Sequence, residues 1–153
     1  MKKVLVMSMV VFLTLAGCAS KDIKETAIPQ DKIYTVIFEG DPKIIDKQVR
    51  SSSDIIIGDI LQETPNGSDL TLVKISIEEA HTPMIQSNTV FVATDGYLKS
   101  DTVGKMGEPV SEGGRLLGFT GKTKLLWFKT KAKVSGLSKA TKNKAAELYN
   151  RVR

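Results

Sequence analysis

LTLVKISI, residues 70–77, is the stretch that decides the fold. Its apolar residues alternate with Lys74 and Ser76. Such a two-residue period places one set of side chains on a buried face and the other in solvent, and so predicts a strand. Another apolar run, residues 55–61, is separated from it by the turn-forming residues PNGS at 65–68. We therefore expect the two runs to pair as an antiparallel hairpin.

Short runs rich in Ile, Val and Leu continue on both sides of this hairpin at the spacing of an all-β sandwich or barrel. The predicted strands are residues 33–38, 48–50, 89–94, 115–119 and 124–130. Residues 99–109 contain glycine and proline but little apolar content, which predicts an exposed loop. The expected fold is mainly β, a single small β-barrel or sandwich domain over residues 33–131, with a short C-terminal helix.

That helix is expected within residues 132–153. Ser138 can cap it, and Ala145, Leu148, Tyr149 and Val152 follow at the spacing that forms one apolar stripe. A helix of about 15 residues is marginal alone, so it needs a surface on which to pack.

The N-terminus has the pattern of an export signal. A positively charged start precedes a short apolar stretch that ends in LAGC. This ending resembles the lipobox of bacterial lipoproteins, which implies that residues 1–17 are removed and that Cys18 is acylated and anchors the protein to a membrane. Residues 18–32 are then a lipidated N-terminus and flexible tether. Ala19 and Ser20 follow Cys18, and lipoproteins without Asp at this place resemble those that a Gram-negative cell sends to the outer membrane, facing the periplasm. An ordinary signal peptide with a chance cysteine is the alternative.

Charge is unevenly distributed along the chain. The formal net charge is +5, yet residues 122–153 hold ten basic side chains and one acidic one, and residues 18–121 carry −6. Next to an anionic lipid surface, each basic residue contributes about 1 kcal/mol to the free energy of membrane binding. The expected contacts with such a surface are Lys139, Lys142, Lys144, Arg151 and Arg153. A solvated extension without a specific contact is the alternative. Nucleic acid is not an expected partner outside the cytoplasm.

Groups for catalysis are scarce. His81 is the only histidine, and the only cysteine is assigned to lipid. A metal cluster of His81 with the carboxylates at 78–79 would place three ligands in one turn, which rarely closes a site. GKT at 121–123 resembles the end of a phosphate-binding loop, but Leu116 occupies the required glycine position and a strand is predicted to follow. We therefore expect no enzyme, no metal and no cofactor.

The β-region resembles a known family, the MCE (mammalian cell entry) domain of bacterial lipid-transport systems. The resemblance lies in the order and spacing of the runs at 33–38, 49–50, 56–60, 72–77 and 88–94. It covers residues 33–129, about two thirds of the chain. Gly58 matches one glycine of the family strand, whereas Asp54 stands where the other would be, and one residue is inserted at 51–53.

The resemblance implies a partner set and a site. Members of the family form homo- or hetero-oligomeric rings whose central loops make a channel for phospholipid, and they work with an ABC permease and ATPase. Tyr97 and Leu98 become the candidate pore residues, although the polar segment 99–109 departs from the family loop.

Two functions are therefore expected. One is a membrane-anchored periplasmic MCE-like lipoprotein, the non-catalytic lipid-binding component of an ABC-type phospholipid transport system. The alternative is a structural or adaptor envelope lipoprotein that uses its basic tail to bind an anionic surface or a protein partner.

Overall fold

The computed structural model describes residues 30–152 except 68, 106 and 136, with the backbone alone at 133–135, 137–142 and 145. Cys18, the predicted signal peptide, most of the predicted tether and Arg153 lie outside the described residues. No helix in the part of the chain that the structure describes is both long enough and apolar enough to cross a membrane.

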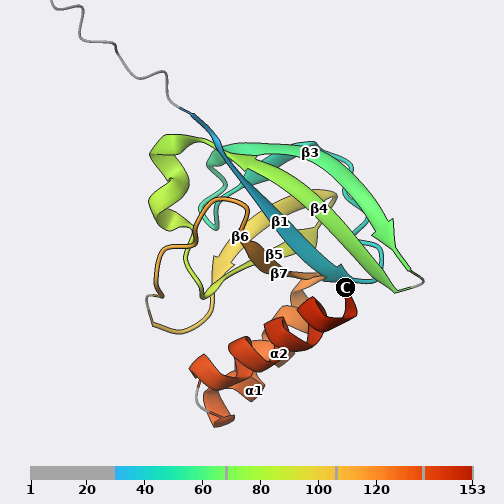
Figure 1. The fold of residues 1–153 in the computed structure, drawn as a ribbon, viewed down its shortest axis with the longest axis vertical. Coiled ribbons are helices and arrows are strands. Elements are labelled where there is room, and N and C mark those ends of the chain that lie inside the picture. The colour runs from blue at the N-terminus through green and yellow to red at the C-terminus, as the bar shows by residue number, and fades with distance from the viewer. Residues whose placement is uncertain (1–29, 68, 106, 136, 153) are drawn as a thin grey trace, which may run out of the picture.

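Seven strands in this part of the chain close into a barrel in the order β1-β4-β3-β2-β6-β5-β7 (Figure 1). They are β1 (Lys32–Glu39), β2 (Gln48–Arg50), β3 (Ile56–Asn66), β4 (Leu70–Ile77), β5 (Thr89–Thr94), β6 (Tyr97–Thr102) and β7 (Arg115–Phe119). A 3₁₀ helix, η1 (Glu79–Met84), lies between β4 and β5. The predicted small, mainly β barrel is confirmed.

The hairpin of β3 and β4 is also confirmed. The two strands pair antiparallel from Gly58 opposite Ile77 to Asn66 opposite Leu70. Gly67 in the turn has a φ of 75°, a conformation that glycine adopts without strain. At the other end, a Cβ on Gly58 would lie 1.9 Å from the carbonyl oxygen of Ser76, so only glycine fits there.

Strand β1 closes the barrel by pairing with a strand on each side. It pairs antiparallel with β4 over its whole length, from Lys32 to Glu39, and parallel with β7 from Thr35 to Phe38. The barrel interior is filled by large side chains, including the buried Tyr34 and Phe38 of β1. Ile37 points to the outer face and is equally buried.

Two helices cover that outer face. α1 (Lys122–Ser135) and α2 (Leu137–Arg151) lie side by side at one end of the barrel (Figure 1). Leu125, Phe128 and Ala132 of α1 are buried in one cluster with apolar residues of β1, β5 and β7. These strands are therefore apolar on both faces, which accounts for their nearly continuous hydrophobic sequence.

The strand predicted at 124–130 is wrong, because these residues belong to α1. Four consecutive apolar residues resemble a two-sided strand, but here Leu125 and Phe128 face the barrel and the two between them face solvent. The helix also removes one objection to a phosphate-binding loop at 121–123. The other stands, since the required glycine position is occupied by Leu116, which lies within β7.

The predicted loop at 99–109 is wrong over its first four residues, which continue β6. Burial alternates along β6 although four of its six residues are polar, and Leu98 and Ser100 are the buried ones. The C-terminal helix is confirmed as α2, with Leu148 buried and Tyr149 and Val152 packed against the same cluster. The expected domain boundary at 131/132 falls inside α1.

Candidate functional site

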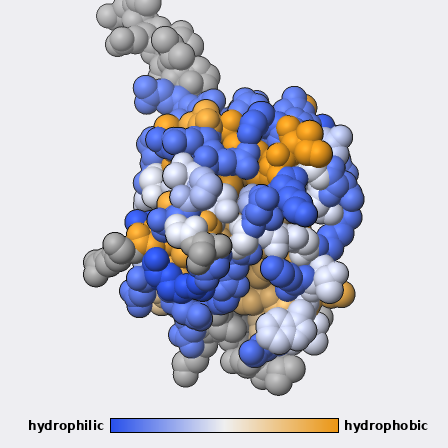
Figure 2. All heavy atoms as spheres, turned by 90° about the vertical axis from the view of Figure 1, so that its right-hand side faces the viewer, coloured by the Kyte–Doolittle hydropathy of each residue, from blue (hydrophilic) through white to orange (hydrophobic). Residues whose placement is uncertain are grey.

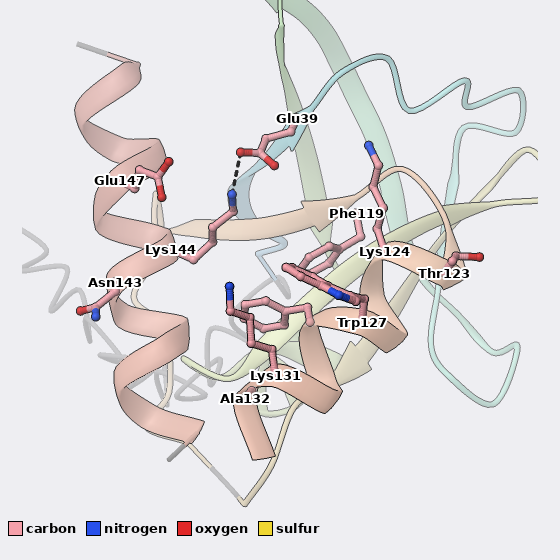
Figure 3. A pocket seen from close by; sticks show the side chains of 11 residues that line it. Glu39, Phe119, Thr123, Lys124, Trp127, Lys131, Ala132, Asn143, Lys144 and Glu147 are labelled. Atoms are coloured by element: carbon pink, nitrogen blue, oxygen red, sulfur yellow. Dashed lines mark hydrogen bonds and ion pairs between the residues drawn. The ribbon is translucent and has the colours of Figure 1, made fainter. Parts of the chain in front are cut away.

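A groove with a volume of about 830 Å³ lies where α1 and α2 meet the ends of β1 and β7 (Figure 3). Its lining comes from β1, β7, α1 and α2: Glu39, Phe119, Thr123, Lys124, Trp127, Phe128, Lys131, Ala132, Asn143, Lys144 and Glu147. A volume of this size is typical of small-molecule sites, which span about 300–1,000 Å³.

The floor of the groove is apolar. Phe119, the last residue of β7, contacts Phe128 of α1, with 5.1 Å between the ring centroids. Ala132 lies one helical turn further along α1 and is fully buried. Trp127 forms one wall and is largely exposed, so a large indole surface faces water. Apolar surface of this kind gains about 25 cal/mol per Å² when a ligand covers it.

The rim of the groove carries charge. Lys124 and Lys131 stand on the α1 side, and the Lys131 Nζ lies 4.8 Å from the centroid of the Trp127 ring. Lys144 extends from α2 toward Glu39 at the end of β1 (Figure 3), and its Nζ lies 2.7 Å from the Glu39 Oε1. Within the described side chains, neither Lys124 nor Lys131 forms an ion pair. The α1 side therefore offers two cations next to an aromatic wall.

Polar contacts hold α2 against the barrel and so fix the second wall. Arg151 contacts Glu39, with 3.5 Å between Nη1 and Oε1, and also pairs with Asp69. The Tyr149 hydroxyl donates a hydrogen bond of 2.5 Å to the carbonyl oxygen of Arg115. Burial raises the pKa of Tyr149 above its usual value, and the nearby Arg115 charge opposes that shift.

These contacts change the interpretation of the predicted anionic-surface residues. Lys144 and Arg151 are engaged with carboxylates of the barrel. Lys139 and Lys142 lie on α2 with only their backbone described, and Arg153 lies outside the described residues. The structure thus gives part of the basic tail an intramolecular role.

The predicted pore residues also differ from expectation. Leu98 is fully buried in the barrel core, opposite Ala93 of β5, and has no surface from which to line a channel. Tyr97 is half-buried, and the guanidinium carbon of Arg50 lies 4.5 Å from its ring centroid. The strand structure of this segment was missed because its polar residues concealed the alternation.

A salt bridge fixes the neighbouring segment. The Lys99 Nζ lies 2.5 Å from the Asp54 Oδ1, and this hydrogen bond holds the pKa of Asp54 below its usual value.

His81 lies on η1, with 3.8 Å between its Nε2 and the Glu78 Oε2. Throughout the described ranges, no three His, Cys, Asp or Glu side chains are grouped so that they could hold a metal ion.

No family model matches the sequence, and the search of curated proteins finds no significant relative. The function is therefore argued from the groove and its surroundings. The groove could not be foreseen from the sequence, because one of its walls, α1, has the apolar run of a strand. The spacing of Leu125, Phe128 and Ala132, at i, i+3 and i+7, is the signal that predicts that wall.

Proposed function

We propose that the protein is a non-catalytic, membrane-anchored lipoprotein of the cell envelope that binds phospholipid as an MCE-like component of an ABC-type transport system. The observation that supports this function is the groove between α1 and α2, with its aromatic floor and its lysine rim. A phospholipid has the matching chemistry, because its acyl chain is apolar and its phosphate is anionic.

The expected strength of binding follows from the acyl chain. Each buried methylene group contributes about 0.8 kcal/mol. A chain that buries ten of them gains about 8 kcal/mol, which corresponds to micromolar affinity before the costs of ordering the chain. Such binding is reversible, as a carrier that must also release its lipid requires.

Two features of the barrel bear on the MCE-like assignment. The position matched to a family glycine, Gly58, tolerates no side chain. In contrast, the barrel interior is packed with side chains, so lipid would contact this subunit on its outside. A ring of copies of this chain, or of this chain with related subunits, and a permease with its ATPase are the partners that the proposal includes.

Photoactivatable phospholipid tests the groove in the full acylated protein. We expect cross-links from the acyl chain to Phe119, which lies on the floor and is partly exposed. Trp127→Asp should abolish them, because it places a charge in the apolar wall. Leu126→Asp is the matched control, since it alters the adjacent exposed residue, which does not line the groove. An unlabelled floor would overturn the proposal.

A second candidate function, an envelope adaptor, is favoured by exposed apolar residues that do not line the groove. Ile45 has 84% of its surface exposed, and Ile55, Ile56 and Leu61 are exposed as well. Figure 2, which looks onto the side of the barrel where β3 and β4 extend, shows hydrophobic side chains grouped toward its upper end. Ile45→Asp should release a protein partner, detected by in-cell cross-linking, and leave lipid labelling unchanged. Release of lipid instead would contradict the adaptor.

A further inference from the structure

The outward face of α1 is unusual for a soluble helix because two large apolar residues stand side by side in water. Leu126 is 67% exposed and Trp127 is 65% exposed. The helical period places the exposed Thr123 and Thr130 on the same face, opposite the buried Leu125 and Phe128. The face therefore has an apolar centre that the barrel does not cover.

Lysines stand on both flanks of this apolar centre. Lys124 and Lys131 lie on the flank toward the groove, and Lys122 and Lys129 lie on the other. Lys129 is held by Asp101 at 2.7 Å, whereas the pair of Lys122 with Asp95, at 3.6 Å, is highly exposed. The sequence of α1 contains five lysines and no acidic residue.

We propose that α1 docks on an anionic lipid bilayer, with Leu126 and Trp127 entering the headgroup region and Lys122, Lys124 and Lys131 facing lipid phosphates. Tryptophan is the side chain that favours the interface between headgroups and acyl chains. A helix with an apolar face and flanking lysines lies in the plane of that interface. Each lysine near the surface contributes about 1 kcal/mol.

Charge complementarity favours a bilayer over a protein as the occupant of this face. Lysines lie on both sides of the apolar pair. The continuous layer of phosphates at a bilayer surface can contact the lysines on both sides at once. Docking also places Trp127, a wall of the groove, at the membrane surface. The inference nevertheless does not depend on the groove binding lipid, because Leu126 and Lys122 do not line it.

The experiment uses Trp127 as its probe, since it is the only tryptophan of the chain. The full acylated protein is reconstituted in phosphatidylcholine vesicles with or without phosphatidylglycerol, with bromine on the lipid acyl chains. We expect quenching of Trp127 fluorescence to be strong with phosphatidylglycerol, weak without it, and reduced by salt. Absence of quenching in the anionic vesicles would overturn the inference.

Uptake of a brominated chain into the groove would also quench Trp127, so variants separate the two events. Leu126→Asp should lower the ratio of docked to undocked protein about tenfold or more. Lys122→Gln, which removes a lysine that does not line the groove, should lower it about fivefold. The charge-matched control is Lys74→Gln, which removes one exposed cation outside α1 and should leave quenching unchanged.

Circular dichroism verifies that each variant is folded. Quenching that persists in Leu126→Asp would show that α1 does not dock. A labelled groove floor with an undocked α1 would overturn this inference alone. A docked α1 with an unlabelled floor would instead overturn the proposed function alone.

Discussion

Helices α1 and α2 are adjacent in the sequence, pack on the same side of the barrel and are both basic, but the balance of the forces that attach them differs. α1 buries Leu125, Phe128 and Ala132 against the strands and adds one close ion pair, between Lys129 and Asp101. α2 buries Leu148 and adds ion pairs with Glu39 and Asp69. The basic residues of α1 flank an exposed apolar pair, whereas Lys144 and Arg151 of α2 turn inward to carboxylates.

The comparison shows that a count of charges does not identify the charges that a partner can reach. The net charge of +9 over residues 122–153 includes both helices. On α2, side chains that were expected to face a membrane neutralise the acidic barrel. On α1, where a strand was expected, cations remain beside exposed apolar surface. The surface available to an anionic partner is therefore nearer the barrel than the sequence indicates.

The largest effect should come from breaking the apolar attachment of α1. Phe128→Ala removes a buried ring that contacts Phe119, and it should lower the free energy of unfolding by about 3 kcal/mol. Leu126→Ala is the control and should change it by less than about 0.5 kcal/mol, because Leu126 is exposed. Denaturant unfolding followed by circular dichroism measures both. Equal effects would show that α1 is not attached through this face.

A smaller effect should come from the ionic attachment of α2. Glu39→Gln removes the carboxylate that Lys144 and Arg151 share, and it should cost about 1 kcal/mol at low salt, since partly exposed ion pairs are weak. High salt should reduce the difference between the two proteins. Glu112→Gln, an exposed carboxylate without an ion pair among the described side chains, is the control. Urea unfolding of both proteins at a low and a high salt concentration tests this. A loss of stability that is the same at both salt concentrations would contradict it.

The smallest effect should come from Tyr149. Its folded pKa lies above the unfolded value of 10.0, so its contribution to stability is complete below that pH and is lost as the pH rises through the folded pKa. Tyr149→Phe should cost about 0.5–1 kcal/mol at neutral pH, the value of one hydrogen bond. The variant should lose less stability than the wild type above pH 10.0. Parallel pH-dependence in the two proteins would show that the phenol is not buried against the barrel.

Much of the barrel could be predicted from the sequence because alternation and turn residues are local signals. The runs at 33–38, 70–77 and 89–94 coincide with strands. The strand predicted for LLWF at 125–128 is wrong because the exposed Leu126 and Trp127 conceal a helical period. A docking surface requires exposed apolar residues of this kind, so the segment that departs from the local pattern is also the candidate docking surface.

The candidate site was less predictable because it depends on contacts between distant residues. Nothing near Glu39 in the sequence indicates that Lys144 and Arg151 will meet it, since these residues lie more than a hundred positions away. The burial of Leu98 likewise depends on its pairing with β5. Local patterns identify elements, whereas the walls of the groove are formed by tertiary packing.

The position of β1 has a mechanical consequence. The chain enters the barrel at Lys32, at the start of a strand bonded on both sides, to β4 and to β7. A force applied to the N-terminal segment acts along β1, whereas the hydrogen bonds between β1 and its neighbouring strands run across that direction. The bonds are then loaded in shear and must break together rather than one by one. A domain tethered at its N-terminus and held at α1 would therefore transmit tension between its two attachments without unzipping.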